Sequence, residues 1–164
     1  TFYRSLDGLP AFEDYTMRGR TYRYMTQEAL YPFGYGLTYG DVRVESVAVV
    51  AQDAVSHDVI LQVELVNKGG CPTQDVLQIY GKDTESADAP PNPALCAFRR
   101  VSLASGERLS VRICVQGEAF QVVNEEGERV WGSGKYMLYA GTGQPDQRTE
   151  KLSGKKSVGV AVVF

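Results

Sequence analysis

Apolar and polar residues alternate along most of the chain after residue 40. The alternation is clearest in residues 58–66 and 108–115, where every second side chain is aliphatic and most of the intervening ones are polar or charged. A period of two is typical of a strand that turns one face to a core and the other to solvent. The aliphatic residues that we expect to be buried are Val59, Leu61, Val63, Leu65, Leu109, Val111, Ile113 and Val115.

The same pattern predicts short strands throughout the rest of this region. They cover residues 41–50, 58–66, 74–81, 97–103, 108–115, about 119–124, 129–131, 135–141 and 157–163. Residues 83–94 contain three prolines within four positions, which exclude a helix and a central strand. Residues 143–156 are polar and are expected to form a long hairpin loop, and no extended helical period is present. Short strands at regular spacing predict an all-β antiparallel sandwich.

The first 40 residues differ in character from the rest. They hold ten of the 17 aromatic residues and none of the 20 valines. Their glycines and prolines predict an irregular, extended chain with a turn near residues 34–36. We therefore divide the chain into an irregular N-terminal aromatic extension, residues 1–40, called the leader below, and a sandwich, residues 41–164. Aromatic side chains gain most by packing into another surface, so the leader is interpreted as an adhesive strap.

Composition excludes several classes of function. The net charge is −3 and the 17 basic residues are dispersed, which argues against a nucleic-acid partner. No apolar stretch approaches the ~20 residues that a membrane span requires. The first residues show neither an initiator Met nor a signal-peptide core, so we expect a longer parent protein. Three cysteines without C-x-x-C spacing favour unpaired thiols and a cytoplasmic rather than a secreted protein.

The residues that could carry catalysis are few. His57 is the only histidine, and its position in a turn predicts a solvated side chain. The carboxylate pairs Glu13–Asp14 and Glu125–Glu126 could act as glycosidase acids. However, adjacent residues on an extended chain point in opposite directions, so we expect interdomain salt bridging at the first pair and solubility at the second. The residues themselves thus predict no catalytic group, no metal site and no cofactor.

The leader's aromatic residues have two functional interpretations, which are stacking on sugar rings and anchoring at an interface. A flexible strap cannot hold a flat stacking platform, whereas Tyr and Arg are enriched in interfaces. We therefore predict interdomain docking. The candidate docking residues are Phe12, Tyr15, Arg20, Tyr22, Arg23, Tyr24, Tyr31, Phe33 and Tyr35.

Several motifs carry a resemblance to a known family. They are residues 9–15, residues 19–24 and, most specifically, Tyr31-Pro32-Phe33-Gly34-Tyr35-Gly36-Leu37-Thr38-Tyr39. Together with residues 75–80, 98–103 and 134–141, they make the chain similar to the C-terminal part of glycoside hydrolase family 3, which includes β-glucosidases and β-xylosidases. Ala97 departs from the glycine usual in the family, and the tail from Gly143 is longer and more charged than expected.

The resemblance implies a fibronectin type III-like, immunoglobulin-like β-sandwich preceded by the connector from a catalytic domain. It also implies a parent that is a retaining exo-glycosidase acting on β-linked glucosides or xylosides. The family's catalytic Asp and Glu belong to the two preceding domains, and no residue of this chain matches either motif. The chain would then be a non-catalytic accessory region that braces the catalytic domains, which are its expected partners. A carbohydrate-binding module and a cell-surface adhesion sandwich remain as alternatives.

The two halves of the leader should behave differently. Residues 32–36 should lie against the chain's own sandwich, because they are close to the first strand. Residues 1–24 should lack a partner within this chain, and could make it self-associate in isolation. Arg20 and Arg23 should bind carboxylates or carbonyls of the partner domains, for which the guanidinium fork is suited.

Overall fold

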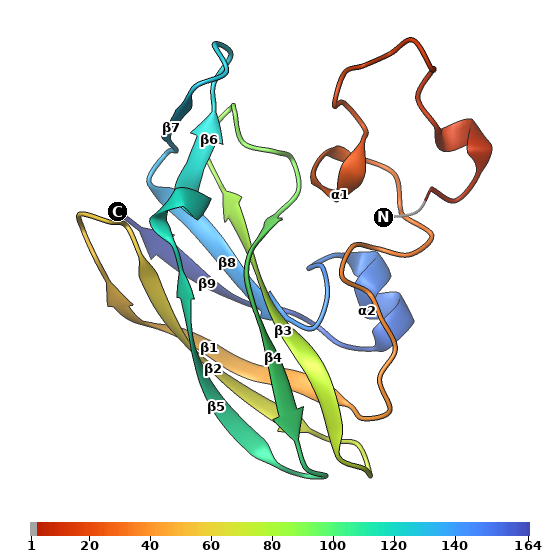
Figure 1. The fold of residues 1–164 in the computed structure, drawn as a ribbon, viewed down its shortest axis with the longest axis vertical. Coiled ribbons are helices and arrows are strands. Elements are labelled where there is room, and N and C mark those ends of the chain that lie inside the picture. The colour runs from red at the N-terminus through yellow and green to blue at the C-terminus, as the bar shows by residue number, and fades with distance from the viewer. Residues whose placement is uncertain (1–2) are drawn as a thin grey trace.

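Two antiparallel sheets stack against each other and enclose the core (Figure 1). The structure is a computed structural model and describes residues 3–164. One sheet has the order β1-β2-β5 and consists of β1 (Val42–Gln52), β2 (Val59–Asn67) and β5 (Arg108–Val115). The other has the order β4-β3-β8-β9 and consists of β4 (Ala94–Leu103), β3 (Thr73–Asp83), β8 (Lys135–Gly141) and β9 (Val158–Val163). A hairpin of β6 (Gln121–Val123) and β7 (Arg129–Trp131) stands at one end.

The core lies between the inward faces of the two sheets. On β2 and β5, Leu61 pairs with Ile113 and Val63 pairs with Val111, so the aliphatic rows predicted from the sequence face the same side. Leu77 and Ile79 of β3 lie in the same buried cluster. Of the eight residues predicted to be buried, seven are buried and Leu109 is half-buried. The antiparallel β-sandwich predicted from the alternation is therefore confirmed.

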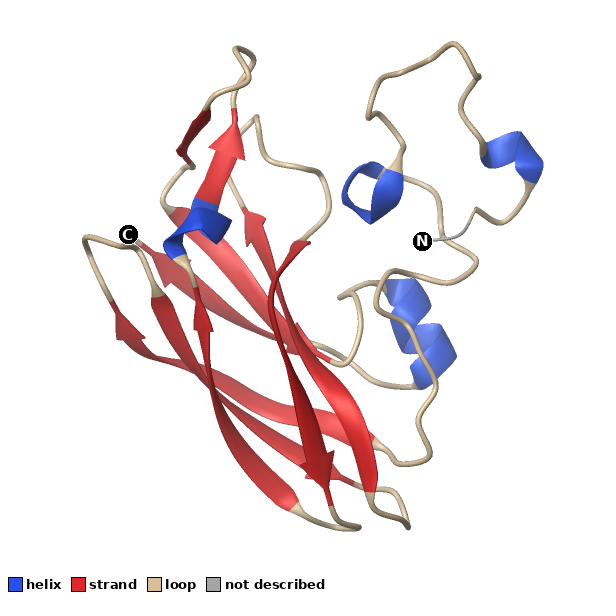
Figure 2. Ribbon diagram, viewed as in Figure 1, coloured by secondary structure: helices blue, strands red, loops and turns tan. Residues whose placement is uncertain are grey.

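The strand prediction is corrected at two places. Residues 143–156 are not a plain hairpin loop, because they contain the helix α2 (Gln147–Ser153; Figure 2). The Asp146 carboxylate accepts a hydrogen bond of 2.6 Å from the Thr149 amide, and Gly154 ends the helix with a φ of +67°. The first part of the predicted strand at 119–124 is a short 3-10 helix, η2 (Gly117–Phe120), held by a 2.8 Å bond from the Gly117 amide to Asp58.

The leader is irregular apart from two single turns, η1 (Leu6–Gly8) and α1 (Thr21–Tyr24). It runs along one side of the sandwich, passes α2, and enters β1 at the end away from the β6–β7 hairpin (Figure 1). Its path brings it over the outward face of β3, and this placement creates the candidate interface.

Candidate interdomain interface

Residues 33 and 34 of the leader are bonded directly to the four-stranded sheet. The Gln78 side-chain amide of β3 donates to the Gly34 carbonyl at 3.1 Å, and the Phe33 amide donates to Gln144 Oε1 at 3.3 Å. The Tyr80 hydroxyl donates to Gln78 Oε1 at 2.7 Å, which orients that amide. Burial raises the pKa of Tyr80 above its usual range, so the hydroxyl stays a donor. The prediction that residues 32–36 lie on the sandwich agrees with these contacts.

Tyr22 also packs on the sandwich. Its ring stacks on Phe33 with centroids 4.1 Å apart and meets the Tyr80 ring edge-on at 6.3 Å. Its hydroxyl accepts a 3.0 Å bond from the Leu95 amide at the start of β4. The Asn92 side chain donates to the carbonyls of Tyr22 and Met25 at 2.9 and 2.8 Å. The expectation that residues 1–24 lack a partner is therefore wrong for residues 21–24, because the proline-rich loop before β4 supplies one.

The helix α2 holds the middle of the leader. Arg148 donates to the Leu30 carbonyl at 3.2 and 3.3 Å, and Lys151 pairs with Glu28 at 2.8 Å. The Lys151 hydrogen bond keeps the pKa of Glu28 below its usual range despite partial desolvation. Tyr31 and Tyr35 stack on each other with centroids 5.6 Å apart. We call residues 21–39 the anchored segment, since all of these contacts fall within it.

The first part of the leader presents apolar side chains to solvent. Phe12 is 88% and Tyr15 is 85% exposed. Leu6, Leu9 and Met17 are exposed beside them. We call residues 6–17 the free segment. Soluble proteins rarely leave large contiguous apolar patches in water, so this segment is a candidate for contact with a partner.

The two predicted docking arginines are placed differently. Arg20 donates to the Asp14 and Thr16 carbonyls, so it closes a loop within the leader itself. Backbone and side-chain hydrogen bonds from Thr16 hold the pKa of Asp14 below its usual range. Arg23 is exposed and Tyr24 is half-buried, both beside the Asn92 contact.

Comparison with known proteins shows which proteins contain a region similar to this chain. Residues 75–144 match the family of fibronectin type III-like domains. The chain is 32% identical over 159 residues to a xylan 1,4-beta-xylosidase of Xylanibacter ruminicola, covering 93% of this chain and 18% of that protein. The chain matches the C-terminal region of glycoside hydrolase family 3.

Solved structures of β-glucosidases share the fold. A β-glucosidase from Erythrobacter marinus matches with a TM-score of 0.73 at 23% identity, over 99% of this chain and 21% of that one. A GH3 β-glucosidase from Bifidobacterium adolescentis matches with a TM-score of 0.70 at 24% identity, over 88% of this chain and 21% of that one. The chain spans about a fifth of the length of the curated relatives that it matches.

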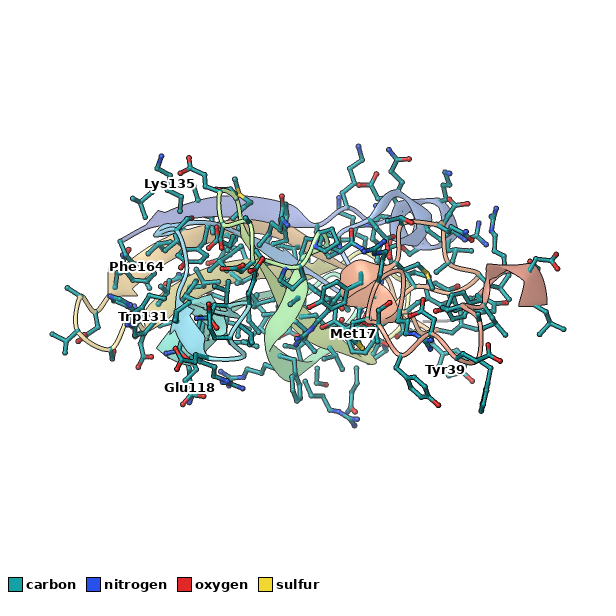
Figure 3. The ribbon with its side chains drawn as sticks, turned by 90° about the horizontal axis from the view of Figure 1, so that it is seen from above. Met17, Tyr39, Glu118, Trp131, Lys135 and Phe164 are labelled. Atoms are coloured by element: carbon teal, nitrogen blue, oxygen red, sulfur yellow. The ribbon has the colours of Figure 1, made fainter. Side chains whose placement is uncertain are left out.

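The motif that carries the family 3 resemblance maps onto the anchored segment. Phe33 and Gly34 are the residues bonded to Gln144 and Gln78, and Thr38 lies 2.6 Å from the Thr73 hydroxyl of β3. Conversely, Leu37 and Tyr39 of the same motif are 91% and 97% exposed. Tyr39 lies at the end of the molecule opposite Trp131 and Phe164 (Figure 3).

The structure corrects the interpretation of His57. Its ring is half-buried rather than fully solvated, because it packs edge-on against Trp131 with centroids 4.1 Å apart and at a tilt against Phe164 with centroids 4.5 Å apart. Its Nδ1 is buried and has no hydrogen-bond partner among residues 3–164. The loop between β1 and β2 packs onto the last residues of the chain. A local sequence pattern does not predict this contact, because the two segments are far apart in the sequence.

The remaining candidate chemistry is dispersed in the structure. Glu13 is exposed, and the Asp14 carboxylate accepts a bond from the Thr16 amide, while Glu125 and Glu126 are exposed in the β6–β7 turn. Cys71, Cys96 and Cys114 are separate thiols, and burial raises the pKa of Cys96 to about 12. Within residues 3–164 no three metal-binding side chains gather, and no helix has the length and apolarity to cross a membrane.

Sequence reasoning did not single out the residues that receive the leader. Gln78, Tyr80, Asn92 and Gln144 make the bonds described above, and all four lie outside the leader. The alternation on β3 offers one signal, because it places Gln78 and Tyr80 together on the face opposite Leu77 and Ile79. A buried Gln on the outer face of a sheet indicates that something covers that face.

Proposed function

We propose that this chain is the non-catalytic accessory region of a longer family 3 glycosidase and that it braces the catalytic domains of that enzyme. The observation that carries the proposal is the division of the leader. The anchored segment is bonded to the sandwich, while the free segment exposes Phe12 and Tyr15 beside it. A segment that is bonded to one domain at one end and exposes apolar side chains at the other is suited to an interface between two domains.

The names of the relatives support β-linked xylosides or glucosides as the substrates of the longer enzyme. The proposed roles within the leader follow its geometry. Phe12 and Tyr15 would insert into the neighbouring domain, with Arg23, Tyr24, Tyr31 and Tyr35 near the edge of the joint. Tyr22 and Phe33 would hold the strap to the sandwich, and Arg20 would keep the loop of residues 14–20 in shape.

The carbohydrate-binding alternative has less support. It needs a row of exposed aromatic residues on the sandwich, for which the sequence offers Tyr80, Tyr136, Tyr139 and Trp131. Tyr80 and Tyr136 are buried, Tyr139 is half-buried, and Trp131 alone among these four is exposed. No observation favours an adhesion role.

The proposal is tested on the pure chain and on the longer polypeptide that contains it. The pure chain should not hydrolyse aryl β-glucosides or aryl β-xylosides. In the longer protein, Phe12→Ser with Tyr15→Ser should lower the thermal midpoint of the catalytic domains, while Val55→Ser, which alters a 90% exposed apolar residue in the β1–β2 loop, should not. Turnover by the pure chain that disappears when one of its own Asp or Glu residues is replaced would contradict the proposal.

A further inference from the structure

Four exposed side chains form a cationic surface on the side of the sandwich where β4 meets β5. These two strands are the outermost ones of their sheets. The Arg99 guanidinium on β4 donates to the Arg112 carbonyl on β5 at 3.2 Å, so the strands are neighbours across this side. Phe98 and Arg100 stand on the outward face of β4 beside them. We call Phe98, Arg99, Arg100 and Arg112 the arginine surface.

The guanidinium groups of the arginine surface have no carboxylate partner. Arg100 reaches Gln74 Oε1 and Arg112 reaches Gln62 Oε1, both at 3.5 Å, which is long for a hydrogen bond. None of the three arginines forms an ion pair within residues 3–164. Most of their donors are therefore available to a partner.

The carboxylates on the neighbouring strands already have partners. Glu45 pairs with Arg108 at 2.9 Å, and Glu64 accepts a bond of 2.7 Å from the Ser110 hydroxyl. Positive charge therefore predominates on this side of the sandwich, although the net charge of the whole chain is −3.

Phe98 shows that these arginines do more than protect an edge. Charged side chains on an outer strand prevent it from pairing with another chain, but an aromatic ring that is 69% exposed does not serve that purpose. Aromatic and arginine side chains are instead the ones enriched in protein interfaces. The composition of the surface indicates a protein partner, and its charge indicates an acidic one.

The chain carries an element of matching chemistry at the end of the β6–β7 hairpin, which extends beyond the two sheets (Figure 1). Glu125, Glu126 and Glu128 are exposed there, and none of them forms an ion pair in the described part of the chain. Val123 precedes them and is 54% exposed, while Arg129 follows as the neighbouring cation. We call Val123, Glu125, Glu126 and Glu128 the acidic tip.

We propose that the acidic tip of one copy of this chain binds the arginine surface of a second copy. Carboxylates would face guanidinium groups, a pairing for which the arginine fork is suited, and Val123 would pack near Phe98. Since the two surfaces differ, the contact is head-to-tail and either extends into a row of copies or closes into a ring. Exposed ion pairs each contribute little, so the association is weak and depends on salt. It is independent of the bracing role, because neither surface includes the free segment.

The test is sedimentation velocity of the chain with Phe12→Ser and Tyr15→Ser, which removes association through the free segment. At low salt the sedimentation coefficient should rise with protein concentration. At about 1 M salt, where the Debye length is about 3 Å, the association constant should fall at least about tenfold. Phe98→Ser should also weaken the association, and its thermal midpoint should be unchanged because the ring is exposed.

Charge reversal identifies the two surfaces. Glu125→Lys with Glu126→Lys should abolish the association, and so should Arg100→Glu with Arg112→Glu, because each change places like charges opposite one another. An equimolar mixture of the two double variants should associate again, since each lysine tip meets a glutamate surface and each glutamate tip meets an arginine surface. A misfolded variant could not be rescued in this way.

Asp88→Lys with Glu118→Lys is the matched control, because both residues are exposed, lie outside the two surfaces and change the net charge by the same amount. This control should associate like the parent chain. The proposal is overturned if the chain stays monomeric at low salt, if salt and charge reversal leave the association unchanged, or if the mixture does not restore it. A monomeric chain whose arginine reversals lower the thermal midpoint of the catalytic domains in the longer protein would also overturn it, and would assign the arginine surface to the interdomain joint.

Discussion

At the scale of single residues, the attachment of the leader depends most visibly on Gly34. Its φ is +75°, a region that L side chains rarely adopt, and an added Cβ would meet the Gln78 amide oxygen and the Tyr80 hydroxyl. Both atoms belong to the buried network that holds the leader, so they cannot move aside without breaking bonds. The glycine is needed here for conformation and for space.

Gly34→Ala should lower the free energy of unfolding by more than about 2 kcal/mol, because it adds backbone strain to a steric conflict. Urea denaturation of the pure chain measures the change. Gly36→Ala is the control, because a Cβ at Gly36 meets nothing within 4 Å and its φ is not positive. Equal effects at the two glycines would show that the leader is not held at residue 34.

Tyr22→Ala should also destabilise the pure chain, by about 2–3 kcal/mol, since it removes a stacked, half-buried ring and its bond to Leu95. Tyr22→Phe should cost about 1 kcal/mol, which isolates the hydroxyl. Tyr15→Ala should leave the unfolding midpoint unchanged, because Tyr15 is 85% exposed. If Tyr22→Ala were as mild as Tyr15→Ala, the anchored segment would begin after residue 24.

At the scale of elements, the sequence predicts the strands whose residues alternate between a buried and an exposed face. It does not predict the contacts between segments that are far apart in the chain. The buried aliphatic residues of β2 and β5 can be predicted from the sequence because both strands have one buried and one exposed face. The α2 helix was missed because seven residues are too few to show a period of 3.6, although its Asp146 cap and Gly154 terminator are visible in the sequence. The predicted docking residues remain a prediction, and their aromatic content does not reveal that Tyr22 packs on the sandwich while Tyr15 is exposed.

Asp83 joins two loops at the end of β3. Its Oδ1 accepts from the amides of residues 85 and 86 and from the Ser133 hydroxyl, and its Oδ2 accepts from the Ser133 amide. Burial works to raise the pKa of Asp83, but the hydrogen bonds from Ser133 and the backbone outweigh it and hold the pKa below its usual range. The charged form is therefore favoured by folding.

Because the folded pKa is depressed, Asp83 should contribute stability that is complete above the unfolded pKa of about 3.9 and lost as the pH falls through the folded value. Asp83→Asn should destabilise the chain near pH 7 and flatten the loss of stability on acidification. Thermal midpoints between neutral pH and pH 3 measure this slope. Asp88→Asn in the same loop is the control, because Asp88 is exposed, and an unchanged slope in Asp83→Asn would contradict the assignment.

At the scale of the whole molecule, apolar exposure is uneven. The free segment carries Phe12 and Tyr15, while the face of the sheet beneath the anchored segment is covered. Trp131 and Phe164 form a separate, partly exposed aromatic group at the other end (Figure 3). Within residues 3–164 the leader therefore exposes more large apolar side chains than any one strand of the sandwich, and the free segment holds five of them.

In isolation the chain should self-associate through the free segment. Phe12→Ser with Tyr15→Ser should reduce concentration-dependent association in sedimentation experiments, and the unfolding midpoint of the monomer should remain unchanged. Trp131→Ser tests the other aromatic group. Association that survives the first pair of changes and disappears with the second would move the adhesive surface to the β6–β7 end.

The bond between the Phe33 amide and Gln144 joins residues 111 positions apart in sequence. During synthesis the leader leaves the ribosome before the sandwich, and Gln144 follows Phe33 only after about 5–20 s at ordinary elongation rates. Gln78 emerges in between, but the face that it shares with Thr142 is complete only when β8 pairs with β3. The leader is thus synthesised early and attached late, so its attachment to the sandwich reports that β3 and β8 have already paired.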